Sequence, residues 1–156
     1  MSKGIWIAVL AVGGAIAAGG ELRAQGAAKS TWDGVYTAAQ AERGQAAYTQ
    51  NCASCHGPEL AGAGEAKPLA GPEFLANWNG LPMGDLYDRI RTTMPMDRPG
   101  ALSGEDYADT LAYMLKFNGF PAGGTELDKR SEVLAGIRID TQKPTGAAVA
   151  TGAGKP

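Results

Sequence analysis

The chain is 156 residues long and contains two cysteines, one histidine, 23 glycines and nine prolines. This length suits one domain with tails, and a formal net charge of −2 argues against a basic, phosphate-binding surface and therefore against nucleic acid as a partner. Two cysteines cannot form a disulfide-dense scaffold or a four-cysteine zinc site, and a single histidine excludes a bis-histidine metal site.

The first residues have the build of a secretory signal peptide. Lys3 gives a positive start, an apolar run follows at 5–18, and small residues come after Arg23. We predict that residues 1–24 are a signal peptide, with cleavage within 24–28, and that the remainder is exported to the periplasm. An uncleaved membrane anchor is the alternative, but the run is short for a span of about 20 residues, so we expect no stable membrane insertion after cleavage. In an oxidising compartment, both cysteines should be covalently occupied.

The remainder of the chain predicts an all-α fold. In chain order we expect an irregular lead-in at 29–36, a helix at 37–51, a loop at 57–73, a short helical patch at 74–79, a helix at 84–93, a proline-bounded loop at 94–100, a helix at 104–118, and some order to about residue 140. Residues 141–156 form a low-complexity tail that we expect to be disordered. No strand of convincing length is predicted.

Two of these helices carry specific end signals. Thr37 is placed as the N-cap of the first, and Ser103 with Asp106 forms an aspartate version of the capping box before the last, which Gly119 ends. Within the first helix, Gly44 costs about 1 kcal/mol relative to alanine, which predicts that another helix backbone approaches closely there. The last helix carries an apolar stripe at Tyr107, Leu111, Met114 and Leu115.

The scarce side chains Cys52, Cys55 and His56 form C-x-x-C-H, the attachment signature of c-type haem. Residues three apart share a helical face, so both thiols can reach the two vinyl groups along one haem edge. His56, next in sequence, then directs its imidazole at the iron from the proximal side. A thioredoxin-like redox pair expects a βαβ surround, and a zinc site lacks a fourth His or Cys. We therefore predict one covalently bound haem c.

The chain resembles a class I monohaem cytochrome c over about residues 37–120. The resemblance is carried by CASCHG at 52–57, TMPMDRPG at 93–100 and LSGEDYADTLAYMLKFNGFPAG at 102–123. The last two stretches are more narrowly similar to periplasmic cytochromes associated with quinoprotein (PQQ) alcohol or sugar dehydrogenases. The resemblance implies a cytochrome c-like helical fold around one haem, within a domain at 29–140.

The sixth iron ligand is left to methionine, lysine or no side chain, because no second histidine exists. Met114 lies on the apolar stripe, where a core role is expected, and Met83 precedes a predicted helix and could line the pocket. Met94 and Met96 lie on the proline-bounded loop, where a thioether can be held over the iron without helical constraints. The family typically ligates through a methionine that precedes proline, a pattern that Met94 matches. We therefore predict Met94, with Met96 as the alternative.

The resemblance also implies supporting roles. The first and last helices should cross, with Gly44 and Tyr48 at the contact. In the family a proline carbonyl accepts the hydrogen of the histidine nitrogen that does not bind iron. Here the corresponding pattern is one residue out of step, so Lys67 or Pro68 is the candidate acceptor. Four side chains are candidates for holding haem propionates, or for packing and solvation alone: Trp78, Arg89, Arg91 and Arg98.

Together these features predict a periplasmic electron-transfer protein, a one-electron carrier with His/Met axial ligation and not an enzyme. The expected donor is a quinoprotein dehydrogenase and the expected acceptor an oxidase or another cytochrome, each held in a transient, small interface. One alternative is a haem enzyme or ligand sensor with an open distal site, which requires Met94 and Met96 both to be unligated. The other is a cytochrome subunit fixed in a dehydrogenase or oxidase complex.

Overall fold

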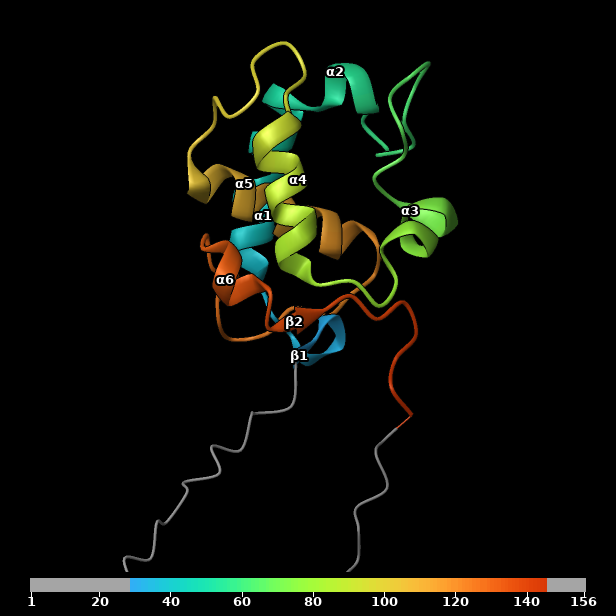
Figure 1. Cartoon of the computed structure of the whole chain (residues 1–156), viewed down its shortest axis with the longest axis vertical. Coiled ribbons are helices and arrows are strands. Elements are labelled where there is room, and N and C mark those ends of the chain that lie inside the picture. Colours follow the sequence, from blue (N-terminus) through green and yellow to red (C-terminus); the bar gives the residue numbers. More distant parts are fainter. Residues whose placement is uncertain (1–28, 146–156) are drawn as a thin grey trace, which may run out of the picture.

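Residues 29–145 are described in a computed structural model of the chain. Its elements, in chain order, are β1 (Lys29–Ser30), the 3-10 helix η1 (Thr31–Asp33), α1 (Ala38–Asn51), α2 (Ala53–His56), α3 (Gly71–Trp78), α4 (Met83–Thr93), α5 (Gly104–Phe117), α6 (Ser131–Leu134) and β2 (Ile137–Arg138) (Figure 1). The described part is predominantly helical, which confirms the all-α fold class. The predicted signal peptide and residues 146–156 of the predicted tail lie outside it.

The two longest helices begin where the capping residues predict. Thr37 accepts a hydrogen bond on Oγ1 from the backbone N–H of Gln40 at 3.1 Å and so caps α1. Ser103 caps α5 through the N–H of Asp106 at 3.0 Å, and the Asp106 carboxylate accepts from the Ser103 N–H at 3.3 Å. These reciprocal bonds satisfy backbone donors that have no partner within the helix, and both predicted caps are confirmed.

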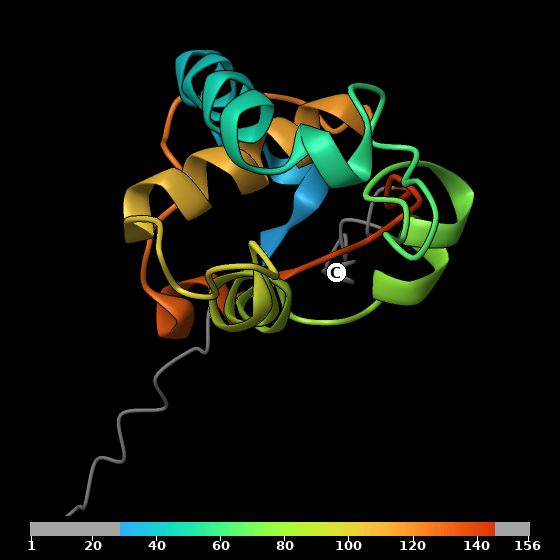
Figure 2. The same ribbon diagram turned by 90° about the horizontal axis from the view of Figure 1, so that it is seen from above.

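α1 and α5 cross at the glycine that the sequence singled out (Figure 2). A Cβ on Gly44 would lie 1.8 Å from the carbonyl oxygen of Asp109 and 3.0 Å from the Cβ of Tyr113. One turn further along α1, the rings of Tyr48 and Tyr113 lie 5.4 Å apart. The prediction that Gly44 and Tyr48 mark the helix contact is confirmed, because only a residue without a side chain allows the two backbones to approach this closely.

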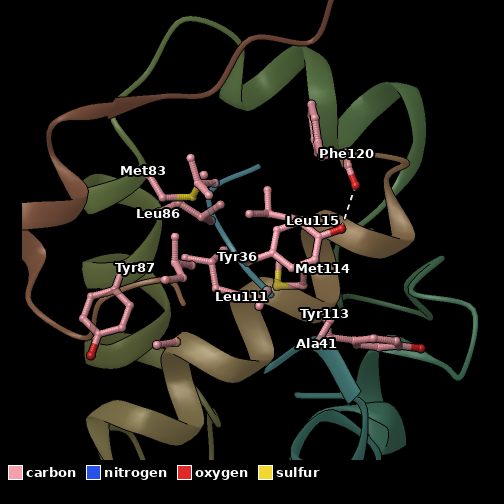
Figure 3. Close-up of a cluster of buried hydrophobic side chains, with 14 of the residues drawn as sticks. Tyr36, Ala41, Met83, Leu86, Tyr87, Leu111, Tyr113, Met114, Leu115 and Phe120 are labelled. Carbon is pink, nitrogen blue, oxygen red and sulfur yellow. Dashed lines mark hydrogen bonds between the residues drawn. The ribbon is translucent and has the colours of Figure 1, made fainter. Parts of the chain in front are cut away.

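The core between α4 and α5 also includes side chains from the segment before α1 and the segment after α5. Buried side chains gather there from α4, from α5 and from the segments flanking α1 and α5, including Tyr36, Met83, Leu86, Leu111, Met114, Leu115 and Phe120 (Figure 3). The Tyr36 hydroxyl donates to the Phe120 carbonyl at 2.6 Å, which satisfies the polar end of a fully buried ring. Figure 3 shows this bond beside the cluster.

The segment after α5, residues 119–141, forms what we call the C-terminal strap. It pairs with the turn before α4 through Gly80 N–H to Ile139 O at 2.7 Å and Ile139 N–H to Leu81 O at 2.9 Å. Its β2 also pairs in parallel with β1, with Lys29 opposite Ile137. The strap is therefore hydrogen-bonded both to β1, at the start of the described chain, and to the connection between α3 and α4.

Several local features differ from the sequence-based expectation, including the 3-10 helix η1 and the short helix α6, neither of which was predicted. α3 begins at Gly71, not in the 74–79 patch, because a proline at position 72 is compatible with the first helical turn. The β1–β2 pair was not predicted, since each strand has only two residues. At the start of the predicted tail, Thr141 is held by its N–H and hydroxyl to the Asn79 side-chain oxygen.

Within residues 29–145 no helix has both the length and the apolar character needed to cross a membrane.

Candidate functional site

The C-x-x-C-H segment forms one tight turn at the end of α1. Cys52 ends α1 and precedes α2, and its carbonyl accepts from the N–H of Cys55 at 3.1 Å and of His56 at 2.9 Å. Gly57, at a φ of 75°, then ends α2. Residues three apart in such a turn lie on one side of it, so the Cys52 and Cys55 thiols can both reach one edge of a bound group. His56 follows Cys55 directly, so its imidazole lies on the same turn.

The imidazole of His56 is buried, with 9% of its surface exposed, and its orientation is fixed by a backbone carbonyl. Nδ1 lies 2.8 Å from the carbonyl oxygen of Lys67. Because a carbonyl can only accept, Nδ1 must carry a hydrogen, and in the neutral imidazole the lone pair then lies on Nε2. Of the two acceptors left open by the sequence, Lys67 and Pro68, the structure selects Lys67. Such a bond is what sets the tautomer and direction of a metal-binding histidine.

The two cysteine thiols are free, with Cys52 half-buried and Cys55 exposed. Burial raises the pKa of the Cys52 thiol to about 11, while the positive charge of Arg98 partly opposes this rise. A thioredoxin-like pair needs a thiol with a lowered pKa, so the environment of Cys52 argues against dithiol redox chemistry. Within residues 29–145 no group of three or more His, Cys, Asp or Glu side chains is placed to hold a metal ion.

The four methionines after Met1 fall into three environments. Met83 and Met114 are buried in the core at 0% and 1% exposure, and the core role expected for Met114 is confirmed. Met96 is 80% exposed. Met94 alone among the four is half-buried, at the boundary between core and surface. Met94 is therefore the one of these four methionines that neither fills the core nor lies largely in solvent.

The loop at 94–100 is fastened to the helices on both of its sides. The Met94 N–H donates to the Ile90 carbonyl at 2.9 Å, and the Met94 carbonyl accepts from the Tyr107 hydroxyl at 2.7 Å. Further along, the Arg98 guanidinium donates to the Asn51 side-chain oxygen at 2.8 Å. Asn51 immediately precedes Cys52, so the structure brings the methionine loop beside the C-x-x-C-H turn, at the same end of the molecule (Figure 1).

The four candidate propionate partners have different surroundings. Trp78 is half-buried and packs against the core, whereas Arg89 is exposed. Arg91 pairs with Asp88 at 3.2 Å on the surface of α4. Arg98 is already engaged with Asn51, so its contribution here is to join the two chain segments that carry the candidate ligands.

A surface groove of about 650 Å³ lies between α4, the loop before α5 and the start of α6, and neither the two cysteines nor His56 nor Met94 lines it. Its basic side chains each lie within 4.0 Å of a carboxylate: Arg91 pairs with Asp88, Lys129 with Glu105 and Arg130 with Asp128. These paired charges give the groove little attraction for an anion. The two free thiols and the buried imidazole lie on the C-x-x-C-H turn and not in this groove.

The comparison with known families agrees with this geometry. Residues 39–114 match the family model described as "Cytochrome C oxidase, cbb3-type, subunit III". This stretch is therefore similar to a cytochrome c domain. The matched span is a little under half of the chain and runs from α1 into α5, so it includes both the C-x-x-C-H turn and the loop at 94–100. No curated protein and no solved structure gives a match.

Similarity to a cytochrome c domain implies a covalently bound c-type haem as cofactor, and the donor set fits that group. Two free thiols three residues apart can form two thioethers, and the buried imidazole engages Nδ1 with the Lys67 carbonyl, which leaves Nε2 to face a metal. In α2, α3, α4 and the loops before α3 and α5, some apolar side chains pack against the core but remain only partly buried: Ala53, Leu69, Trp78, Ile90 and Leu102. Such side chains suit contact with a flat, largely apolar cofactor.

Two residues around the site were not identified as functional from the sequence. Tyr107 reads as one member of the α5 apolar stripe, yet its hydroxyl reaches the Met94 carbonyl. Asn51 reads as the last residue of α1, yet its side-chain oxygen holds Arg98 while its amide donates to the Ala47 carbonyl at 2.8 Å. A tyrosine within an otherwise apolar stripe was the available signal, because a buried hydroxyl needs a partner.

Proposed function

We propose that the protein is a periplasmic one-electron carrier in which Cys52 and Cys55 hold a single haem c and His56 and Met94 are its axial ligands. The observation that carries the proposal is the His56–Lys67 bond, since it holds the buried ring in one orientation and leaves Nε2 as the nitrogen available to bind iron. When bound, the haem supplies reversible one-electron redox chemistry, at a potential that His/Met ligation raises.

The chain's own residues account for the difference between a carrier and a haem enzyme. Met94 extends from a loop whose backbone is fastened to α4 and α5, so its thioether can be held in one place. A filled sixth position leaves no room for an external ligand, which favours electron transfer over ligand binding or catalysis. Met96, at 80% exposure, would have to leave solvent to serve in the same role.

Binding of carbon monoxide to the ferrous holoprotein at neutral pH tests this assignment. The wild-type protein and Met96→Ala should bind carbon monoxide only slowly, whereas Met94→Ala should bind it rapidly and stoichiometrically and should lose the thioether–iron charge-transfer band in its ferric form. Rapid binding by the wild-type protein would favour the open-site enzyme or sensor. Opening of the site in Met96→Ala alone would transfer the ligand role to Met96.

The redox partners follow from the resemblance and not from the geometry. Similarity of the stretches at 93–100 and 102–123 to cytochromes associated with quinoprotein dehydrogenases supports such an enzyme as donor, with an oxidase or another cytochrome as acceptor. The matched family model names an oxidase subunit, and this supports a fixed-subunit role as the second candidate. Native purification distinguishes the two: a carrier elutes alone from the periplasmic fraction, and a fixed subunit elutes with its complex.

Export is tested on the full chain. We expect the mature protein in the periplasmic fraction, with its N-terminus within residues 24–28 and its mass increased by one haem. Recovery of the uncleaved chain in the membrane fraction would support the anchored alternative.

A further inference from the structure

One buried phenol holds the start of the loop at 94–100. Tyr107, on α5, is 1% exposed, and its hydroxyl donates to the carbonyl of Met94 at 2.7 Å. The other contact to that carbonyl, from the Gly100 N–H, is longer at 3.4 Å. The phenol is therefore the principal partner of the Met94 carbonyl among the described residues.

The direction of the Tyr107 hydrogen bond is determined by its neighbours. The carbonyl of Met94 can only accept, so the phenol hydrogen must point toward it. The Leu102 N–H lies 3.5 Å from the same phenol oxygen and donates to it weakly. From within the core, Tyr107 thus connects Met94, at the start of the loop, with Leu102, two positions past its end.

Two helices together fix the backbone of Met94. Its N–H is bound to Ile90 of α4 and its carbonyl to Tyr107 of α5, so both peptide groups flanking the Met94 Cα are held. Only side-chain torsions are then left to place the thioether. Loss of the phenol hydroxyl would release one of these two restraints at Met94 itself, while the Arg98–Asn51 bond would still hold the far part of the loop.

We infer that Tyr107 is a positioning residue for the distal ligand: its hydrogen bond to the Met94 carbonyl holds the methionine where its thioether closes the sixth iron position. This inference rests on the proposed ligand role of Met94. The Tyr107 hydroxyl thereby affects the thioether–iron bond and not only the stability of the fold.

Tyr87 provides a matched control. It is 2% exposed, and its hydroxyl donates to the Gly104 carbonyl at 3.1 Å. Like Tyr107, it therefore links a buried phenol to a backbone carbonyl across α4 and α5. Its acceptor, however, lies outside the loop at 94–100. Tyr107→Phe and Tyr87→Phe each remove one such bond, but only Tyr107→Phe removes it from Met94.

The test measures how readily imidazole replaces the thioether in the ferric, full-length holoprotein, followed by loss of the charge-transfer band. A neutral hydrogen bond typically contributes about 1 kcal/mol, so Tyr107→Phe should bind imidazole about fivefold more tightly than wild type, and Tyr87→Phe within about twofold of wild type. Both variants should unfold more easily, so unfolding alone does not separate a positioning from a packing role. Equal imidazole affinities in Tyr107→Phe and Tyr87→Phe would overturn the inference.

Two further proteins complete the design. Met94→Ala should lack the charge-transfer band before imidazole is added; if the band persists there, the ligand assignment itself is wrong. If Met94→Ala lacks the band but the two tyrosine variants behave alike, only the role of Tyr107 is wrong. Replacement of Tyr107 by 4-aminophenylalanine keeps a donor at the same position and should return imidazole affinity toward that of wild type. If Tyr107→Phe gives no holoprotein, the 4-aminophenylalanine protein still tests the inference. An imidazole affinity of that protein equal to the affinity of Met94→Ala would contradict it.

Discussion

Replacing Gly44 by alanine should destabilise the protein, although alanine is the better helix former. The added Cβ would lie 1.8 Å from the carbonyl oxygen of Asp109 and 2.4 Å from the carbonyl carbon, both of which are backbone atoms of α5. No side-chain rotation relieves these contacts. The backbones must therefore separate by about 1.2 Å to bring the nearer contact even to 3.0 Å, the shortest distance that real Cβ atoms show.

The magnitude follows from two opposing terms. In an unobstructed helix, glycine to alanine stabilises by about 1 kcal/mol. Overpacking of a well-filled contact costs about 1–3 kcal/mol, and separation of the helices also weakens the packing of Ala41 and of the Tyr48–Tyr113 pair. Because the obstruction is backbone, the cost should lie at or above the upper end of that range. We expect a net loss of about 2 kcal/mol in the free energy of unfolding.

Guanidinium denaturation of the holoprotein, followed by far-UV circular dichroism, measures this loss. Ala46→Gly is the control: Ala46 is exposed on the same helix, so the change should cost about 1 kcal/mol through helix propensity alone. A Gly44→Ala protein as stable as wild type, or more stable, would refute the account of the helix crossing.

Three further changes test separate parts of the structure. Thr110→Val should stabilise the protein by about 1 kcal/mol in thermal or chemical unfolding, because the buried Thr110 hydroxyl has no hydrogen-bond partner in the described part of the chain; destabilisation would mean that the holoprotein supplies a partner. Asn118→Ala should cost about 2 kcal/mol, since its side chain accepts from the Gly71 N–H at 3.0 Å and donates to the Leu69 carbonyl at 3.1 Å; an unchanged denaturation midpoint would contradict this. Burial raises the pKa of Tyr48 to about 12 from an ordinary value of 10.0. The folded protein therefore holds this proton more tightly than the unfolded chain does. The contribution of Tyr48 to stability should be complete below pH 10 and fall between pH 10 and 12, and Tyr48→Phe should make that fall shallower; an unchanged slope would count against burial as the cause.

The parts of the fold that sequence reasoning predicted are those with local signals. The limits of α1 and α5 follow from Thr37 and Ser103, whose side chains bond to backbone groups within the same turn. The crossing of the two helices follows from Gly44, since an unexplained glycine in a helix indicates a close neighbour. α3 was placed too late because the Gly71–Pro72 pair suggests a loop, although proline is compatible with a first helical turn.

The parts that were missed depend on contacts between distant segments. The β1–β2 pair joins residues more than 100 positions apart in strands of two residues, and nothing in either segment identifies its partner. The same holds for the strap, where Ile139 pairs through its backbone with Gly80 and Leu81. Backbone pairing of this kind depends little on side-chain identity, so composition and periodicity do not report it.

In the candidate site, too, the sequence identified what is local, and the structure was needed for what depends on distant segments. The C-x-x-C-H turn is contiguous in sequence and could be identified directly, whereas the choice between Lys67 and Pro68 required the position of the loop relative to His56. The environments of Met94 and Met96 also differ only in three dimensions, because both lie on one short loop. Their separation by exposure depends on how Tyr107 and Arg98 fasten that loop.

A potentiometric titration of the purified full-length protein, followed by its visible spectrum, tests the central claim most directly. The account predicts a single reversible one-electron transition between low-spin ferric and low-spin ferrous forms, with a thioether–iron charge-transfer band in the ferric spectrum. A high-spin, five-coordinate spectrum in either state would contradict the proposed carrier with His56 and Met94 as ligands, as would a protein that carries no covalent haem.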